Sequence, residues 1–77
     1  MKIQILGGGC AKCIKLAENA QAAIDESGLD AQIEKITDSD RIMDMGVMIT
    51  PALAIDGQVK STGKVLEKSE ILRLIGS

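Results

Sequence analysis

The 77-residue chain has no tryptophan, tyrosine, phenylalanine or histidine. Proteins that bind single-stranded nucleic acid stack its bases on aromatic side chains, and this chain offers none. Its formal net charge is −2, and its nine basic residues are scattered along the sequence. Binding to duplex DNA or RNA would require a basic patch. We therefore expect no nucleic-acid partner, and a core made of isoleucine, leucine, valine, methionine and alanine.

Long hydrophobic runs are also missing. No stretch approaches the roughly 20 apolar residues needed to cross a membrane, and the apolar start at residues 1–6 is too short for a signal peptide. We therefore expect a cytoplasmic protein without a membrane partner. The hydrophobic fraction of 45% and the charged fraction of 26% are those of an ordinary folded protein. We expect a single domain over residues 1–77.

Cysteine is scarce, and its two copies stand close together. Cys10 and Cys13 follow three glycines and are separated by Ala11 and Lys12. In the cytoplasm such a pair is more often catalytic, redox-sensing or metal-binding than a structural crosslink. A disulfide here would also close a loop of only about four residues, which stabilises a fold little. The sequence indicates no cofactor, and we predict none.

The residues after Cys10 are expected to form a helix over residues 11–27. Apolar residues recur there at helical spacing, and Gly28 provides a C-terminal cap. The unpaired N–H groups at a helix start favour a nearby anion, so Cys10 is predicted to be a more acidic thiol than usual. Lys12 either stabilises that thiolate or is simply a solvated side chain, and both interpretations stay open.

The remaining pattern predicts an α/β fold. Apolar periodicity and turn residues indicate seven elements in the order β-α-β-α-β-β-α. Helix caps at residues 38–40 precede the second helix, Thr50-Pro51 precedes the third strand, and Asp56-Gly57 indicates a hairpin. We expect the first strand to be buried on both faces. The predicted strands cover residues 2–6, 29–36, 52–55 and 58–60, and the predicted helices cover residues 11–27, 41–45 and 67–75.

Met43, Met45 and Met48 stand close together in the sequence. Thioethers are soft ligands that can bind copper(I). Methionine also fills irregular gaps in a core, and this core has no aromatic residues to fill them. We interpret these methionines as core residues, and we predict no metal site.

Three features occur together in this chain: a Cys-x-x-Cys that opens the first helix, a Thr-Pro before the third strand, and an Asp-Gly hairpin. With this arrangement the whole chain resembles a minimal thioredoxin-like fold, and in particular the small redox-active disulfide proteins of archaea and bacteria. The resemblance implies a four-stranded mixed sheet with flanking helices. It also implies a protein disulfide oxidoreductase, thioredoxin-like or glutaredoxin-like, that serves electron transport and cell redox homeostasis.

The resemblance assigns roles to individual residues. Cys10 would attack a substrate disulfide, and Cys13 would resolve the mixed disulfide, which leaves a Cys10–Cys13 disulfide. Pro51 would be a cis-proline beside the sulfurs, and Thr50 would offer its backbone to an extended substrate segment. Gly63 would leave room for substrate, or it is an ordinary turn glycine. The implied partners are protein disulfide substrates and an upstream thiol reductase, and we expect a monomer.

The chain departs from the thioredoxin pattern at three places. Gly9 stands where thioredoxins carry a tryptophan, and Ala11-Lys12 replaces a pair that contains proline. We count Gly9, Ala11 and Lys12 as supporting residues that tune the reduction potential. Gln4 stands where thioredoxins keep a buried acid, so water or another group would accept the proton. Residues 61–64 lack the glutathione-binding signature of glutaredoxins.

Two other functions stay open at the level of sequence. A heavy-metal carrier could hold copper(I) or zinc between the two thiolates, although such domains place two strands directly after the first helix and end on a strand. A structural zinc site would need four ligands, and the chain has two cysteines and no histidine. A partner-binding module could keep the fold and use the cysteine pair as a redox switch.

Overall fold

The computed structural model describes residues 1–9 and 11–76, and it contains the seven elements in the predicted order. Their bounds are β1 (Lys2–Leu6), α1 (Ala11–Ser27), β2 (Gln32–Ile36), α2 (Ser39–Asp44), β3 (Ala52–Ile55), β4 (Gln58–Thr62) and α3 (Lys68–Ile75). β2 begins later than predicted because residues 28–31 form a turn after α1, in which the Ala31 N–H donates to the Leu29 carbonyl at 3.0 Å.

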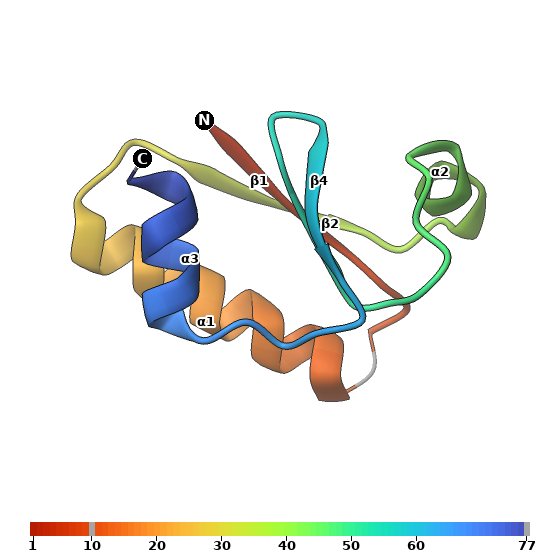
Figure 1. Cartoon of the computed structure of the whole chain (residues 1–77), viewed down its shortest axis with the longest axis horizontal. Helices are drawn as coiled ribbons and strands as arrows, with labels where there is room; N and C mark the ends of the chain where they lie inside the picture. The colour runs from red at the N-terminus through yellow and green to blue at the C-terminus, as the bar shows by residue number, and fades with distance from the viewer. Residues whose placement is uncertain (10, 77) are drawn as a thin grey trace.

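The four strands form one mixed sheet in the order β2-β1-β3-β4 (Figure 1). β1 is parallel to β2 and antiparallel to β3, and β4 is antiparallel to β3. β2 and β4 are therefore the two edge strands. Since Leu6 at the end of β1 pairs with Ala52 at the start of β3, the loop after β1 lies beside the segment that enters β3.

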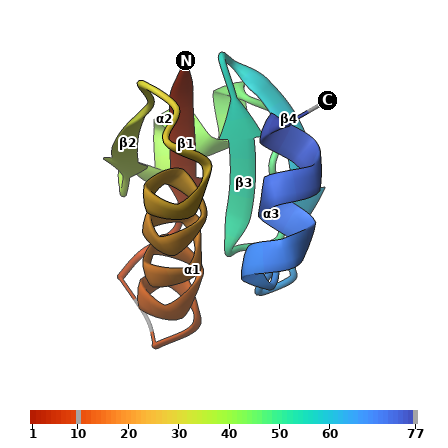
Figure 2. The same ribbon diagram turned by 90° about the vertical axis from the view of Figure 1, so that its left-hand side faces the viewer.

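Helices α1 and α3 cover one face of the sheet (Figure 2). Side chains alternate between the two faces of a strand, so the odd-numbered residues of β1 and β3 point toward these helices. The larger core consists of buried residues of the sheet, of both helices and of the segment before α3: Ile3, Ile5, Leu53 and Ile55 with Leu16, Ala17, Ala20, Ala23, Ile24, Leu66, Ile71 and Ile75. The apolar spacing of α1 predicted its buried face correctly.

The short helix α2 covers only one end of the opposite face. Its buried Ile42, with Val47, packs against the even-numbered sheet residues Leu6, Ile36, Ala52 and Ala54. Elsewhere on this face Lys2 is exposed and Gln4 is half-buried. The prediction that β1 is buried on both faces is therefore wrong for these two residues. Among the described residues, no helix extends over this part of the sheet.

The turn between β3 and β4 consists of Asp56 and Gly57. Both have positive φ, 51° and 86°, which is the backbone of a type I′ hairpin and explains the Asp-Gly sequence. The Asp56 N–H donates to the Lys2 carbonyl at 2.8 Å, and the Lys2 N–H donates to Asp56 Oδ1 at 2.8 Å. These bonds hold the hairpin against the start of β1.

The elements give the molecule two distinct ends. β1 begins and α3 finishes at one end, whereas β1 finishes and α1 and β3 begin at the other (Figures 1 and 2). The second end carries the predicted site residues that the structure describes. Within residues 1–9 and 11–76, no helix is long and apolar enough to cross a membrane.

Candidate active site

Cys13 lies in the first turn of α1 and is only 5% exposed. Helical spacing places it on the same buried face as Leu16 and Ala17. Gly7, in the loop after β1, lies directly against it: a Cβ on Gly7 would collide with Cys13 Sγ and would stand 3.8 Å from Pro51 Cα. Three segments of the chain therefore meet at the Cys13 thiol.

The segment that enters β3 is the third of these. The Thr50–Pro51 peptide bond is cis, Pro51 is buried and Thr50 is exposed. Proline has no N–H to donate, but Pro51 stands directly before β3, so the sheet loses no hydrogen bond there. The Pro51 carbonyl accepts a hydrogen bond from the Gly63 N–H at 2.8 Å. Thr50, Pro51 and Gly63 thus lie together, and Pro51 lies beside Gly7, which packs against Cys13.

Two features of the structure favour glycine at position 63. Its φ is 72°, in the left-handed region that glycine adopts without strain. A Cβ there would also stand 2.9 Å from Cγ2 of Ile49, an exposed side chain. Both interpretations of Gly63 that the sequence left open are compatible with this geometry.

Cys10 and the predicted Cys10–Cys13 disulfide lie outside the described residues. Gly9, Ala11 and Lys12 are all exposed, and Gly9 has a φ of 82°. α1 begins at Ala11, the residue that follows Cys10 in the sequence, and its first turn contains no acidic side chain. The positive end of the helix is therefore not neutralised from within α1.

A cavity of about 70 Å³ reaches Cys13 from the β2 side of the molecule. Its lining runs from buried residues to exposed ones: Ile5, Gly7 and Cys13, then Gly9, Ile14, Lys35 and Thr37. Lys35 pairs with Ile5 in the sheet and, by alternation, lies on the α1 face. The sequence suggested that the glycines at 7–9 let the backbone approach the sulfur site without singling out Gly7, and it gave no sign of Lys35. The alternation of Ile33 and Lys35 along the sequence indicates that they share one face of the sheet. It does not predict the strand register that brings Lys35 beside Ile5.

A groove of about 370 Å³ runs between α2 and the segment that leads to Thr50. It is lined by Gly8, Thr37, Ser39, Ile42, Met43, Val47, Met48 and Thr50. Met43 and Met48 are 70% and 95% exposed, so the prediction that they fill the core is wrong. Ile42 is the one buried residue of this short helix. Met45 does pack against the smaller core, as predicted.

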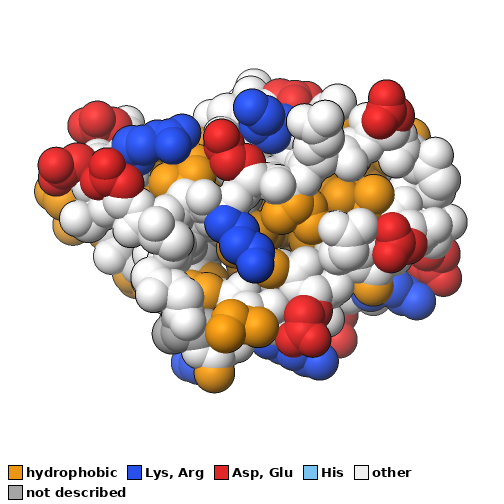
Figure 3. Space-filling model, turned by 180° about the vertical axis from the view of Figure 1, so that it is seen from behind, with side chains coloured by type: hydrophobic (Ala, Val, Ile, Leu, Met, Phe, Trp, Pro, Cys, Tyr) orange, Lys and Arg blue, Asp and Glu red, His pale blue; other side chains and the backbone are white. Residues whose placement is uncertain are grey.

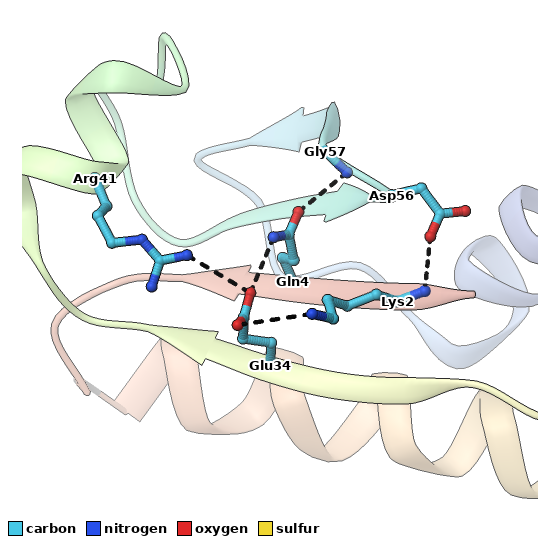
Figure 4. Close-up of polar contacts among 6 residues, drawn as sticks. All are labelled: Lys2, Gln4, Glu34, Arg41, Asp56 and Gly57. Atoms are coloured by element: carbon cyan, nitrogen blue, oxygen red, sulfur yellow. Dashed lines mark hydrogen bonds and ion pairs between the residues drawn. The ribbon is translucent and has the colours of Figure 1, made fainter.

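The uncovered part of the sheet carries a polar cluster (Figure 4). The Gln4 side-chain amide donates to Glu34 Oε1 at 3.0 Å, and Gln4 Oε1 accepts from the Gly57 N–H at 3.2 Å. Glu34 also pairs with Arg41 at 3.8 Å and with Lys2 at 4.0 Å. The hydrogen bond from Gln4, with the two cations, holds the pKa of Glu34 below its ordinary value, although desolvation opposes them. Gln4 thus belongs to a cluster on the face opposite α1.

The fold differs from that of the heavy-metal-binding domains considered above. Here α2 follows β2, and α3 follows β4, whereas those domains place two strands after the first helix and end on a strand. Within the described part of the chain, no group of three or more histidine, cysteine, aspartate or glutamate side chains could hold a metal ion.

The element order, the mixed four-stranded sheet and the cis-proline beside a buried cysteine of α1 define a thioredoxin-like α/β protein. A family model described as a thioredoxin domain matches residues 1–76. A relative named thioredoxin, from Methanothermobacter thermautotrophicus, is 47% identical over 75 residues, which are 97% of each chain. Another, from Methanocaldococcus jannaschii, is 41% identical over 69 residues, which are 90% of this chain and 79% of the relative. The chain therefore belongs to the thioredoxin family.

Proposed function

We propose that this chain is a thiol–disulfide oxidoreductase that acts on protein disulfides through Cys10 and Cys13. Membership of the thioredoxin family supports such chemistry in general terms. The observation that carries the assignment of roles is the burial of Cys13 against Gly7, in the loop that also lies beside Pro51. A thiol that is 5% exposed does not meet the disulfide of a folded substrate directly. It is suited to attack a sulfur held by its own chain.

The proposed exchange has two steps. First, the Cys10 thiolate attacks one sulfur of the substrate disulfide, which forms a mixed disulfide and releases the other substrate sulfur as a thiolate. Second, the Cys13 thiolate attacks the Cys10 sulfur, so that the Cys10–Cys13 disulfide forms and the substrate leaves with two more electrons. An upstream thiol reductase then returns the pair to the dithiol. Neither step calls for a cofactor.

The start of α1 supports the role of Cys10 as the nucleophile. Cys10 directly precedes Ala11, the first helical residue, and no acid stands in the first turn. The partial positive charge of a helix start favours a thiolate over a thiol. Lys12, exposed in the same turn, adds a positive charge at this end of the helix. Gly9 stands where other thioredoxins carry a tryptophan, and Ala11 belongs to a pair that contains proline in those proteins. The residues around the two cysteines are therefore less rigid in this chain.

Thr50, Pro51 and Gly63 form the proposed substrate surface. Thr50 is exposed beside the buried Pro51, so its backbone can pair with an extended segment of a substrate. Met48 and Ile49, which are 95% and 64% exposed, add apolar surface next to it. Exposed apolar patches on folded proteins commonly mark docking sites. The cytoplasmic location, the monomeric state and the action of residues 1–77 as one domain stay predictions.

The test is reduction of a protein disulfide, such as those of insulin, with dithiothreitol as the electron source. The wild type is expected to exceed the rate with dithiothreitol alone, and Cys10→Ser to abolish this excess. Cys13→Ser is expected to accumulate a covalent adduct with the substrate, detected by mass spectrometry. Circular dichroism of both variants controls for folding. Turnover that survives in Cys10→Ser would overturn the proposal, as would stoichiometric copper(I) or zinc binding without turnover.

A further inference from the structure

We infer that Lys35 of β2, which lines the cavity that reaches Cys13, is a positioning residue for the second step of the exchange: its ammonium group stabilises the Cys13 thiolate. The inference rests on the proposed function, in which Cys13 is the resolving thiol. Lys35 belongs to no motif of the sequence. The observations that lead to it are the burial of Cys13, the shape of the cavity and the placement of charges around it.

Cys13 needs help to become a thiolate. A thiol attacks a disulfide only after it has lost its proton, and burial disfavours the charged form. Gln4, at the position of the buried acid in other thioredoxins, has no carboxylate to accept this proton. Its side chain is also held by Glu34 and Gly57 on the other face of the sheet. Gln4 therefore does not take the proton of Cys13.

The cavity offers a route for this proton. Its volume of about 70 Å³ is large enough to hold water. It runs from the buried Cys13 to the exposed Ile14, Lys35 and Thr37. Thr37 and Lys35 are residues with polar side chains on its lining, and a hydroxyl or an ammonium group can hydrogen-bond to such water. Water in the cavity can thus accept the proton of Cys13 and pass it to solvent.

Lys35 is the one charged residue on the lining of this cavity among the described residues. Its pairing with Ile5 and the alternation of β2 point it toward α1, whereas Glu34 points to the opposite face. Glu18 of α1 shares the adjoining surface hollow with Lys35, but no ion pair joins them within the described chain. Figure 3 shows the molecule from behind, where basic, acidic and hydrophobic side chains are interspersed.

The other charged groups near Cys13 are placed less favourably. Lys12 and Lys15 of α1 are exposed and line neither the cavity nor the adjoining hollow. The polar cluster of Figure 4 lies on the opposite face of the sheet. β3 has no charged residue, and Lys64 lines a separate hollow beside α3. Lys35 is therefore the cation whose removal should affect Cys13 most.

The second step can then be written with its protons and electrons. Cys10 is bonded to a substrate sulfur, and Cys13 gives its proton to water in the cavity while Lys35 stabilises the thiolate. The electron pair of that thiolate forms the Cys10–Cys13 bond, and the bond between Cys10 and the substrate breaks. The substrate sulfur leaves as a thiolate and takes a proton from solvent.

The first test is a thiol titration in a Cys10→Ser background, where Cys13 is the only thiol. Since the chain has no tyrosine or tryptophan, the ultraviolet absorbance of the thiolate can be followed against pH without overlap. Lys35→Met is expected to raise the midpoint by about half a pH unit to one unit, because a nearby cation favours the thiolate. Lys35→Arg keeps the charge and is expected to leave the midpoint near that of its parent.

Lys60→Met is the matched control, since it removes the same charge from the opposite edge strand, β4. It is expected to leave the midpoint unchanged. Added salt should reduce the difference between Lys35→Met and its parent, because salt screens exposed charges. Equal shifts in Lys35→Met and Lys60→Met, or no shift in either, would overturn the inference. So would a shift in Lys35→Arg as large as that in Lys35→Met, because that would be an effect of packing.

The second test uses both cysteines and the coloured reagent dithiobis-nitrobenzoate. Attack by Cys10 releases a first coloured thiolate, and attack by Cys13 releases the second. At pH values below the titration midpoint of Cys13, Lys35→Met is expected to slow the second phase roughly three- to tenfold, in proportion to the loss of Cys13 thiolate. The first phase is expected to stay unchanged. A second phase unaffected by Lys35→Met would contradict the inference. A wild type without a second phase would defeat the proposed function, yet the Cys13 titration would still report on Lys35.

Discussion

Gly7 shows how one residue can decide what fits beside the Cys13 thiol. In the sequence it is one of three consecutive glycines, and nothing distinguishes it from Gly8. In the structure, a Cβ on Gly7 would collide with Cys13 Sγ, whereas a Cβ on Gly8 would have no atom within 4 Å. Gly7 is also buried and Gly8 is exposed. Glycine is therefore required at position 7 by the space that Cys13 occupies.

We predict that Gly7→Ala destabilises the fold by about 1–3 kcal/mol, the usual cost of adding a group to a packed site. Gly8→Ala is the matched control and is expected to leave the free energy of unfolding nearly unchanged. Urea unfolding followed by far-ultraviolet circular dichroism measures both, because the chain has no tryptophan for fluorescence. Equal losses in the two variants would show that backbone flexibility, and not contact with Cys13, sets the need for glycine.

The site residues divide into those that a motif reveals and those that need coordinates. The Cys-x-x-Cys and Thr-Pro patterns fix where Cys13, Thr50 and Pro51 stand relative to α1 and β3, while the roles of these residues stay predictions. Lys35 could not be found in this way, since its place beside Cys13 depends on the register between β1 and β2. The exposure of Met43 was missed because helix α2 buries only a single side chain.

At the scale of elements, the polar cluster links β1, β2 and α2 where the sheet lacks a covering helix. Gln4 comes from β1, Glu34 from β2 and Arg41 from α2. The pKa of Glu34 is lower in the folded chain than in a free glutamate, first because of the Gln4 hydrogen bond. The ionised form of Glu34 therefore favours the folded state.

We predict that Glu34→Gln lowers the free energy of unfolding at neutral pH and has less effect in acid. Since the folded pKa is depressed, the stabilisation is fully present above the unfolded pKa of about 4.3 and is lost as the pH falls through the folded pKa. Urea unfolding at a series of pH values measures the difference from the wild type. Glu18→Gln, on the exposed face of α1, controls for removal of a negative charge. A difference that is constant through the acid range would contradict the prediction.

The elements themselves were largely predictable because each has a local signal. The helical spacing of α1, the cap at Asp38 and the Asp56-Gly57 turn all have the predicted geometry, and the Asp38 side chain accepts from the Asp40 N–H at 2.9 Å. The start of β2 was predicted too early because Leu29 suits a strand by its side chain alone. Hydrogen bonds of the turn after α1, which the sequence does not specify, fix the boundary.

At the scale of the whole molecule, stability depends on a core of aliphatic side chains. Leu53 in β3 is fully buried between the sheet and the two long helices, at 0% exposure. A chain of 77 residues is expected to have a free energy of unfolding of roughly 4–12 kcal/mol. A cavity in this core therefore removes a large share of the total.

We predict that Leu53→Ala costs about 2–5 kcal/mol, through lost burial and the cavity it leaves. Leu29→Ala, at a site that is 41% exposed, is the matched control and is expected to cost much less. Thermal unfolding followed by circular dichroism measures both. Similar losses at the two sites would mean that the core described here does not limit stability.

The arrangement of the two ends has a practical consequence. β1 starts and α3 stops away from the end where Cys13 and Pro51 meet (Figures 1 and 2). A purification tag, a surface linker or a second protein fused to either end of this sequence would therefore stay clear of Cys13 and Pro51. Such a fusion could be immobilised through either end with the Cys13 end of the molecule still facing solution.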